Sequence, residues 1–318
     1  MLRTWQALRG RGVLGINQRN CDLVLQYNRR HLYPLVDDKL LTKERALASG
    51  LRVPELYGVI ETEQGIAELG DLLSAHSDFV IKPAQGAGGD GVLVINDRFE
   101  GFYRAGGGKL LTLDDLEFHI SGMLSGIYSL GGHRDRAIIE YRVKPDPVFS
   151  SISFEGVPDI RIIVLKGYPV LAMLRLPTRQ SHGKANLHQG AIGVGVNLAT
   201  GVTTGGTWHN TRIQRHPDTA NPVAGVELPY WHEFLQIAST CYELTGLGYL
   251  GVDLVLDVDK GPMILELNAR PGLNIQIAND VGLLNRTRAV ESRLSHTKLP
   301  FWGETPADRI AWCQKTFQ

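Results

Sequence analysis

The segment GPMILELNARPG, residues 261–272, combines the characters of a buried strand and of a polar site. Its run of aliphatic residues predicts a strand. Glu266, Asn268 and Arg270 recur at every second position, so in a strand their side chains project from one face. An acid, an amide and a guanidinium on a half-buried face are costly unless they bind something. The segment therefore predicts a binding surface.

The preceding segment, residues 248–258, is predicted to pair with residues 262–269 in a hairpin that turns at Asp259-Lys260 or one residue later. The first register places Asp253 opposite Glu266, with Cβ atoms about 4.5–5.5 Å apart. Carboxylates this close repel each other unless a cation lies between them. With Asn268 they form an all-oxygen donor set that suits one or two Mg²⁺ ions. The alternative is a solvated sheet face.

A second signal is the glycine pattern in FVIKPAQGAGGDGVLVI, residues 79–95, at Gly86, Gly88, Gly89 and Gly91. A dinucleotide-binding fingerprint requires a helix after the glycines, whereas VLVI predicts a strand. A glycine loop between two strands is a flap whose backbone N–H groups can face a triphosphate. On glycine content alone, a flexible hairpin tip is the favoured explanation.

Two lysines favour the flap. Lys82 lies inside an apolar strand at the start of the loop, where a buried lysine requires an anionic partner. Lys39 lies in the first turn of a predicted helix, where a cation opposes the helix dipole unless an anion binds there. A protein-kinase interpretation, suggested by Gly-Gly-His133-Arg-Asp135, fails because the lysine precedes the glycines and Asp-Phe-Gly is absent. The P-loop pattern is also absent.

A third group of polar residues lies on the predicted hairpin PDIRIIVLKGYPVLAMLRL. Asp159 and Arg161 share one face, and a three-residue turn at 166–168 sets Arg175 opposite Asp159. With Arg270, this gives three guanidiniums suited to charge that builds up on a transferred phosphate. Structural ion pairing is the alternative for each arginine.

The segment KANLHQGA, residues 184–191, follows this hairpin. Lys184 and Asn186 are candidate contacts to phosphate or ribose. His188 is a candidate general base, but a positioned or core histidine is the favoured interpretation.

Composition limits the possible functions. Of 318 residues, 43% are hydrophobic and 21% charged, and Lys+Arg equals Asp+Glu at 33 each, so no net field favours nucleic acid. Six arginines but one aspartate precede residue 34, which predicts a basic segment that is either solvated or binds an anionic partner. Three scattered cysteines match no metal spacing, and Cys241 is predicted in the core. Without a signal peptide or a membrane-spanning run, we expect a soluble cytoplasmic protein.

Helices and strands mix without regular βαβ alternation, which predicts an α+β fold of two lobes. Helices are predicted over 37–50, 112–130 and 229–245, and residues 1–36 are predicted to be irregular. The predicted organisation is a basic N-terminal segment (1–36), an N-lobe with the flap (37–139), a C-lobe with the metal hairpin (140–290) and a C-terminal tail (291–318).

Taken in order, the strand lysine, the glycine flap, Glu140-Tyr141-Arg142-Val143 and the polar hairpins resemble the ATP-grasp superfamily. GVPDIRIIV, LRLPT, KANLHQGAIGVGV and ELNARPGL are similar to its alpha-L-glutamate ligase homologues, the sugar-transfer-associated branch. The resemblance covers about residues 37–290 and implies an ATP-grasp fold with ATP between two α+β lobes.

The resemblance also implies roles for individual residues. Lys39 and Lys82 would contact phosphates, with Lys82 also near the adenine, which Glu140 and the backbone after Tyr141 would read. Further implied roles are as follows: Asp159, Lys184 and Asn186 line the nucleotide; Asp253, Glu266 and Asn268 bind Mg²⁺ or Mn²⁺; Arg161, Arg175 and Arg270 face phosphate.

The implied chemistry is ATP-dependent ligation of a carboxylate to an amine through an acyl phosphate, for instance adding glutamate to a peptide, protein or cell-surface precursor. Small-molecule or peptide substrates are expected, and a homo-oligomer or a partner protein stays open. A small-molecule kinase on the same fold and a non-catalytic ATP-binding protein are the alternatives. Related glutamate ligases carry a full α/β domain before the helix at Lys39, where this chain has about 38 residues. Substrate identity is therefore open.

Overall fold

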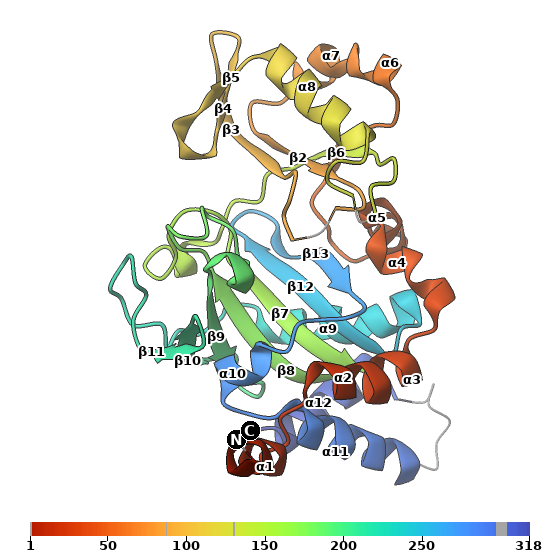
Figure 1. Cartoon of the computed structure of the whole chain (residues 1–318), viewed down its shortest axis with the longest axis vertical. Coiled ribbons are helices and arrows are strands. Elements are labelled where there is room, and N and C mark those ends of the chain that lie inside the picture. The colour runs from red at the N-terminus through yellow and green to blue at the C-terminus, as the bar shows by residue number, and fades with distance from the viewer. Residues whose placement is uncertain (1, 87, 130, 297–303) are drawn as a thin grey trace. The chain divides into compact units, whose positions relative to one another are not determined.

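The structure is a computed structural model that describes residues 2–86, 88–129, 131–296 and 304–318. The chain forms two compact units. Unit 1 comprises residues 1–37, 45–52 and 144–318, and unit 2 comprises residues 38–44 and 53–143. Each unit contains one antiparallel sheet with helices against it (Figure 1). The predicted α+β class is confirmed.

Unit 2 is built on a six-stranded sheet in the order β1-β6-β2-β3-β4-β5. The helix α8 packs on it, and its Thr112–Asp115 capping box satisfies backbone N–H groups of the first turn. The helix ends at Leu124, earlier than predicted, because Gly126 adopts a left-handed φ of 87°. The elements are β1 Leu56–Ile60, α6 Glu63–Ile66, α7 Leu69–Leu73, β2 Phe79–Pro83, β3 Leu93–Phe99, β4 Phe102–Ala105, η3 Gly106–Gly108, β5 Leu110–Leu111, α8 Leu113–Leu124 and β6 Ala137–Glu140.

The helix α5, Lys39–Ala48, begins in unit 2 and ends in unit 1. The Asp38 carboxylate accepts hydrogen bonds from the backbone N–H groups of Leu40 (2.9 Å) and Leu41 (3.4 Å), so Asp38 is the N-cap of this helix. Gly50, with φ of 71°, follows the last turn.

Unit 1 is built on a seven-stranded sheet in the order β11-β10-β9-β8-β7-β12-β13. Its central strands are buried along almost their whole length, which explains their continuous apolar runs. The elements after residue 143 are η4 Pro147–Phe149, β7 Asp159–Leu165, β8 Tyr168–Leu176, η5 Leu187–Gln189, β9 Ile192–Val196, β10 Thr203–Trp208, β11 Thr211–Ile213, α9 Trp231–Thr245, β12 Tyr249–Asp257, β13 Gly261–Asn268, α10 Ile275–Asn279, α11 Leu283–His296 and α12 Pro306–Thr316.

Helices lie on both faces of this sheet. The helix α9 packs against β7, β8 and β12, and buries the predicted core residue Cys241 completely. On the face that carries the polar residues, α10 lies against β8 and β9 (Figure 1). A Cβ atom at Gly195 would approach the carbonyl oxygen of Ala278 to 2.6 Å, so glycine there lets α10 lie close to the strand.

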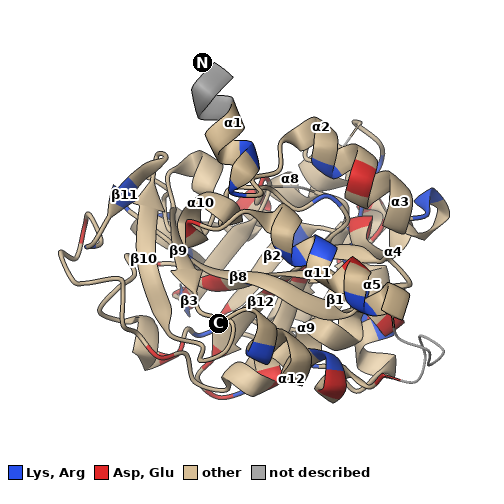
Figure 2. Cartoon of the chain, turned by 90° about the horizontal axis from the view of Figure 1, so that it is seen from below, with Lys and Arg blue, Asp and Glu red and all other residues tan. Residues whose placement is uncertain are grey.

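The N-terminal segment is helical, and its predicted irregular structure is wrong. It contains α1 Leu2–Gly10, α2 Ile16–Arg19, the π-helical turn η1 Asn20–Val24, α3 Leu25–Tyr27, η2 Arg30–Leu32 and α4 Pro34–Asp37. Leu23 and Val24 are buried within unit 1, so tertiary packing supplies the stability that short polar helices lack. Arg9, Arg19 and Arg30 lie in α1, α2 and η2, whereas Arg11 and Arg29 lie between these elements. Figure 2 colours the basic residues of the described chain blue. Within the described residues, no helix is both long and apolar enough to cross a bilayer.

Candidate functional site

The strands β7, β8, β12 and β13 bring most of the predicted unit 1 site residues onto one face of the sheet. The pairing is Asp159 with Arg175, Arg161 with Asp253, and Asp253 with Glu266. Paired residues in an antiparallel sheet project to the same side, and Asn268, two residues after Glu266, follows them. The predicted pairs Asp159–Arg175 and Asp253–Glu266 are confirmed.

Asp253 is the centre of this group. Its carboxylate accepts hydrogen bonds from Arg161 Nε (2.6 Å) and Nη2 (2.5 Å), from Arg175 Nη2 (2.7 Å) and from Asn268 Nδ2 (3.2 Å). Arg175 also binds both oxygens of Asp159. Arg161 and Arg175 therefore form the ion pairs of the alternative interpretation, and they also lie on the predicted face beside its carboxylates.

The two aspartates differ in their electrostatics. Burial raises the pKa of Asp159 to about 6, although the charge of Arg175 opposes this shift. Burial acts on Asp253 in the same direction, but the charges of Arg161 and Arg175 outweigh it and lower the pKa to about 2. Asp253 is therefore a carboxylate at neutral pH.

The metal prediction depends on which oxygens remain for an ion. Within the described residues, no three His, Cys, Asp or Glu side chains form a metal-binding group. Asp253 Oδ1 accepts a single hydrogen bond and retains a lone pair. Glu266 is half-buried opposite it, and Asn268 supplies an amide oxygen. Two carboxylates and one amide fit Mg²⁺ when nucleotide phosphates and water complete its six ligands.

Arg270 does not continue the alternation of β13, which ends at Asn268. Its side chain is exposed, and its guanidinium lies 5.0 Å from the centre of the Tyr33 ring. The expectation that Arg270 projects from the strand with Glu266 and Asn268 is therefore wrong, because the chain bends at residues 269–270.

The segment 184–191 lies beside this face, where Leu187 approaches Gly193. Asn186 caps η5, and its Oδ1 accepts a hydrogen bond from the His188 backbone N–H (3.0 Å). Lys184 is half-buried. His188 is exposed, which contradicts a core position but leaves the positioned histidine and the general base as predictions.

In unit 2, the predicted residues Lys82 and Glu140 form an ion pair on neighbouring strands β2 and β6. Lys43, which the sequence analysis missed, lies 2.7 Å from the other carboxylate oxygen and donates a hydrogen bond to the Pro54 carbonyl (2.5 Å). The exposed fractions are 6% for Lys43, 5% for Lys82 and 2% for Glu140. Two buried cations therefore share one buried anion.

The charges of this triad perturb one another. Burial, partly offset by Glu140, lowers the pKa of Lys43 to about 8. Burial alone would raise the pKa of Glu140, but the charges of Lys82 and Lys43 hold it below its ordinary value. The excess positive charge suits an anionic ligand such as a phosphate.

Next to Glu140, the other residues of the predicted adenine-reading segment have structural contacts. The Tyr141 backbone N–H donates to the Glu55 carbonyl (2.8 Å), and Arg142 binds Asp78 through Nε (3.0 Å) and Nη2 (2.9 Å). Val143 is buried.

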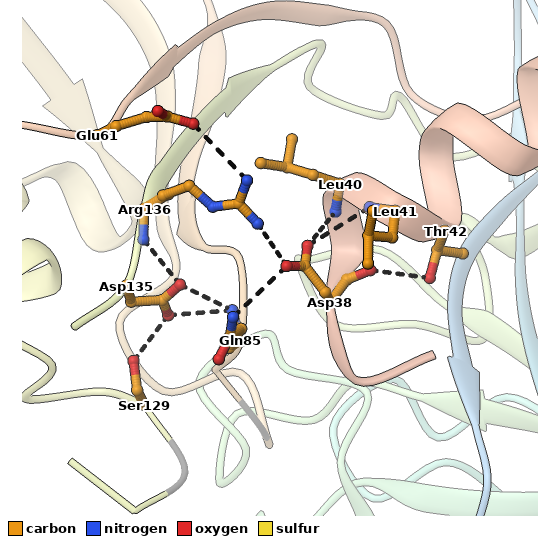
Figure 3. A network of polar contacts seen from close by, with 9 residues as sticks. All are labelled: Asp38, Leu40, Leu41, Thr42, Glu61, Gln85, Ser129, Asp135 and Arg136. Atoms are coloured by element: carbon orange, nitrogen blue, oxygen red, sulfur yellow. Dashed lines mark hydrogen bonds and ion pairs between the residues drawn. The ribbon is translucent and has the colours of Figure 1, made fainter. Parts of the chain in front are cut away.

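The glycine loop starts from a polar network (Figure 3). The Gln85 backbone N–H donates to both oxygens of Asp135, at 3.1 and 3.0 Å, and Ser129 Oγ donates to the same carboxylate at 2.8 Å. Arg136 forms an ion pair with Asp38, the N-cap of α5. The network thus ties the start of the loop to the start of the helix that carries Lys39.

Within unit 2, Lys39 Nζ donates a hydrogen bond to the Gly86 carbonyl (2.6 Å). Three of the predicted glycines, Gly88, Gly89 and Gly91, have φ of 68°, 80° and 74°, which side chains with a Cβ rarely adopt. The glycine requirement is therefore conformational, and it leaves the loop without side chains at these positions.

A family model described as sugar-transfer-associated ATP-grasp matches residues 18–292. The chain belongs to this family. The resemblance found in the sequence is therefore confirmed, and with it the ATP-grasp fold. No curated protein matches the chain.

Solved structures similar to this ATP-grasp protein include two ligases and one synthetase. The ATP-grasp ligase PsnB with a minimal precursor is 14% identical, and the match covers 85% of this chain and 64% of that chain with a TM-score of 0.45. The D-cycloserine synthetase DcsG is 18% identical, with 83% of this chain and 72% of that chain covered and a TM-score of 0.45. D-alanine–D-alanine ligase from Bacillus anthracis is 15% identical, with 89% of this chain and 68% of that chain covered and a TM-score of 0.43. The chain spans less than two thirds of the length of PsnB.

Proposed function

We propose that the protein is an ATP- and Mg²⁺-dependent ligase that joins a carboxylate to an amine. The observation that carries the proposal is the face on which Asp253 binds two arginines beside Glu266 and Asn268. Such a face combines oxygen donors for a cation with guanidiniums for phosphate charge. Membership of the ATP-grasp family supports ATP as the nucleotide.

In the proposed reaction, a substrate carboxylate oxygen attacks the γ-phosphorus of ATP, ADP leaves, and an acyl phosphate forms. The amine then attacks the acyl carbon, phosphate leaves, and the nitrogen loses a proton to give the amide. Phosphoryl transfer of this kind requires positioning and charge neutralisation more than a protein nucleophile.

We assign the roles within unit 1 as follows. Asp253, Glu266 and Asn268 hold Mg²⁺, which supplies positive charge to the phosphates when bound. In the described part of the chain, Nη1 of Arg161 and of Arg175 has no hydrogen-bond partner. These groups are assigned to stabilise the charge that builds up on the transferred phosphate.

In unit 2, Lys82 and Lys39 are assigned to nucleotide phosphates, and the glycine loop to the triphosphate through its backbone N–H groups. Glu140 is assigned to the adenine end through its position beside Lys82, with Tyr141, Arg142 and Val143 as the backbone next to it. Asp159, Lys184 and Asn186 are assigned to the nucleotide from unit 1.

The test is a screen for ADP release over carboxylic acids and amines, followed by mass spectrometry of the products. We expect release that depends on Mg²⁺ and on both substrates, and an amide product. Glu266→Gln should abolish turnover with the circular dichroism spectrum unchanged, while the exposed control Glu227→Gln should retain it. A stable phosphorylated product without an amine would identify a kinase, and nucleotide binding without turnover would identify a non-catalytic protein.

A further inference from the structure

The N-terminal segment is bound to unit 1 at the start of β12 and the end of β13. The Asn28 side chain donates to the carbonyls of Tyr249 (2.8 Å) and Ala269 (2.9 Å) and accepts from the Tyr249 N–H (2.9 Å). Arg19 Nη1 donates to the Pro271 carbonyl (2.7 Å). The segment thereby adds its own side chains to the sheet end next to the candidate site.

Arg19 is a buried cation without a counter-ion. Its exposed fraction is 7%, and within the described residues it forms no ion pair with an acidic group. The carbonyl of Pro271 is its hydrogen-bond acceptor, and its Nε has none. Since a buried guanidinium is normally paired with an anion, Arg19 indicates a site for an anion that the chain does not supply.

Tyr249 provides a second unsatisfied group. Its ring is completely buried, and its hydroxyl has no hydrogen-bond partner in the described residues. Tyr249 lies four residues before Asp253 in β12 and therefore on the same face. Burial raises the pKa of Tyr249, and the positive charges of Arg19 and Arg161 oppose this shift.

Pro271 connects these groups. A Cβ atom at Gly251, between Tyr249 and Asp253 on the same face, would approach Pro271 Cβ to 2.6 Å. Pro271, whose carbonyl binds Arg19, therefore covers this part of the polar face. Arg19 directly precedes the π-helical turn η1. The Oδ1 atom of Asn20, the first residue of this turn, is also buried and has no hydrogen-bond partner among the residues that the structure describes. Such turns occur frequently at functional sites.

We propose that Arg19 and Tyr249 form a subsite for the carboxylate of a small organic acid, the substrate class of the ligase. The identification of the anion as a substrate rests on the proposed function. A guanidinium and a neutral hydroxyl match one carboxylate charge, whereas a phosphate dianion would require more donors. Arg19 Nε and the Tyr249 hydroxyl oxygen are both shielded from solvent. Entry of the acid therefore requires α2, which carries Arg19, to move away from Pro271. In the described residues, Arg19 is held to Pro271 by a single hydrogen bond.

The test is calorimetric titration with acetate, succinate and L-glutamate, without ATP or Mg²⁺ and at constant ionic strength with chloride. We expect the wild-type protein to bind at least one of these acids more tightly than inorganic phosphate. Arg19→Gln should weaken binding at least about tenfold, because a charged hydrogen bond is lost. Arg30→Gln, an exposed arginine of the same segment, should leave the affinity unchanged.

If Arg19→Gln fails to fold, Tyr249→Phe provides the second test of the subsite. Removing a buried hydroxyl that has no partner should leave the unfolding temperature unchanged or raise it, while the affinity for the acid falls. If a buried water satisfies these atoms instead, Tyr249→Phe lowers the unfolding temperature and no acid binds. Absence of carboxylate binding, unchanged affinity in Tyr249→Phe, or binding of phosphate alone would each overturn the proposal. Because ATP is absent, failure here is distinguishable from failure of the ligase assignment.

Discussion

Arg161 and Asp253 face each other across β7 and β12 and are joined by two hydrogen bonds, 2.6 Å from Nε and 2.5 Å from Nη2. Arg175 binds the same carboxylate. The exposed fraction of the Asp253 side chain is 2%. One buried carboxylate therefore fixes the orientation of two guanidiniums, and its loss would leave both without their shared acceptor.

We expect Asp253→Asn to destabilise the protein by about 3–5 kcal/mol, the cost of removing one partner from a buried ion pair. Urea unfolding followed by circular dichroism measures the change. The double variant Asp253→Asn/Arg161→Gln should recover part of the loss, because one unpaired cation is removed with the anion. A loss below about 1 kcal/mol would mean that solvent reaches the pair and screens it.

The triad in unit 2 predicts opposite results for two substitutions. Glu140→Gln leaves Lys43 and Lys82 buried without an anion and should cost about 3–5 kcal/mol of unfolding free energy. Lys43→Met leaves the neutral pair Lys82–Glu140, so the unfolding free energy should stay within about 1 kcal/mol of the wild type or increase. Chemical denaturation of both variants checks the order. Equal destabilisation would show that the excess positive charge is compensated within the protein.

Lys43 also predicts a pH dependence. Because burial lowers its pKa to about 8 in the folded protein, the unfolded chain binds more protons at this residue between pH 8 and its ordinary value near 10.5. At pH 7 Lys43 is charged in both states, so burial of its charge destabilises the folded protein by the full amount. This destabilisation decreases as the pH rises through the range from 8 to 10.5. The wild type should gain stability relative to Lys43→Met, by at most about 1.4 kcal/mol per pH unit. Unfolding series at pH 7, 9 and 10 measure the difference, and a constant difference would contradict the lowered pKa.

The two hairpins that carry the candidate site, β7–β8 and β12–β13, were predicted with the correct pairing of their polar residues but with an incorrect turn. The first has a two-residue turn, Lys166-Gly167, where three residues were expected, and Val170 is the extra residue that restores the pairing of Asp159 with Arg175. In the second, residues 258–260 form the turn, and Leu265 is the extra residue before Asp253 and Glu266 pair. Alternation along a strand reveals which residues share a face, but a β-bulge leaves no such signal.

Two other features depended on tertiary structure. Lys43 lies four residues after Lys39, so both lysines fall on one side of α5, and this spacing was the available signal. Nothing in the local pattern showed that Lys43 would be buried against Glu140. The helices at 16–27 are too short and polar to be recognised without the tertiary packing that buries Leu23 and Val24.

Arg270 and Tyr33 provide a test of the phosphate-facing role assigned to Arg270, because the guanidinium lies 5.0 Å from the ring centre on an exposed site. The cation–π contact is worth about 0.5–1 kcal/mol, so Arg270→Ala and Tyr33→Leu should each reduce stability by no more than about this amount. If Arg270 neutralises charge in the transition state, Arg270→Ala lowers kcat for ADP release about hundredfold or more, whereas Tyr33→Leu, which only frees the side chain, lowers it a few-fold. Similar kcat values for the two variants would leave Arg270 with a structural role alone.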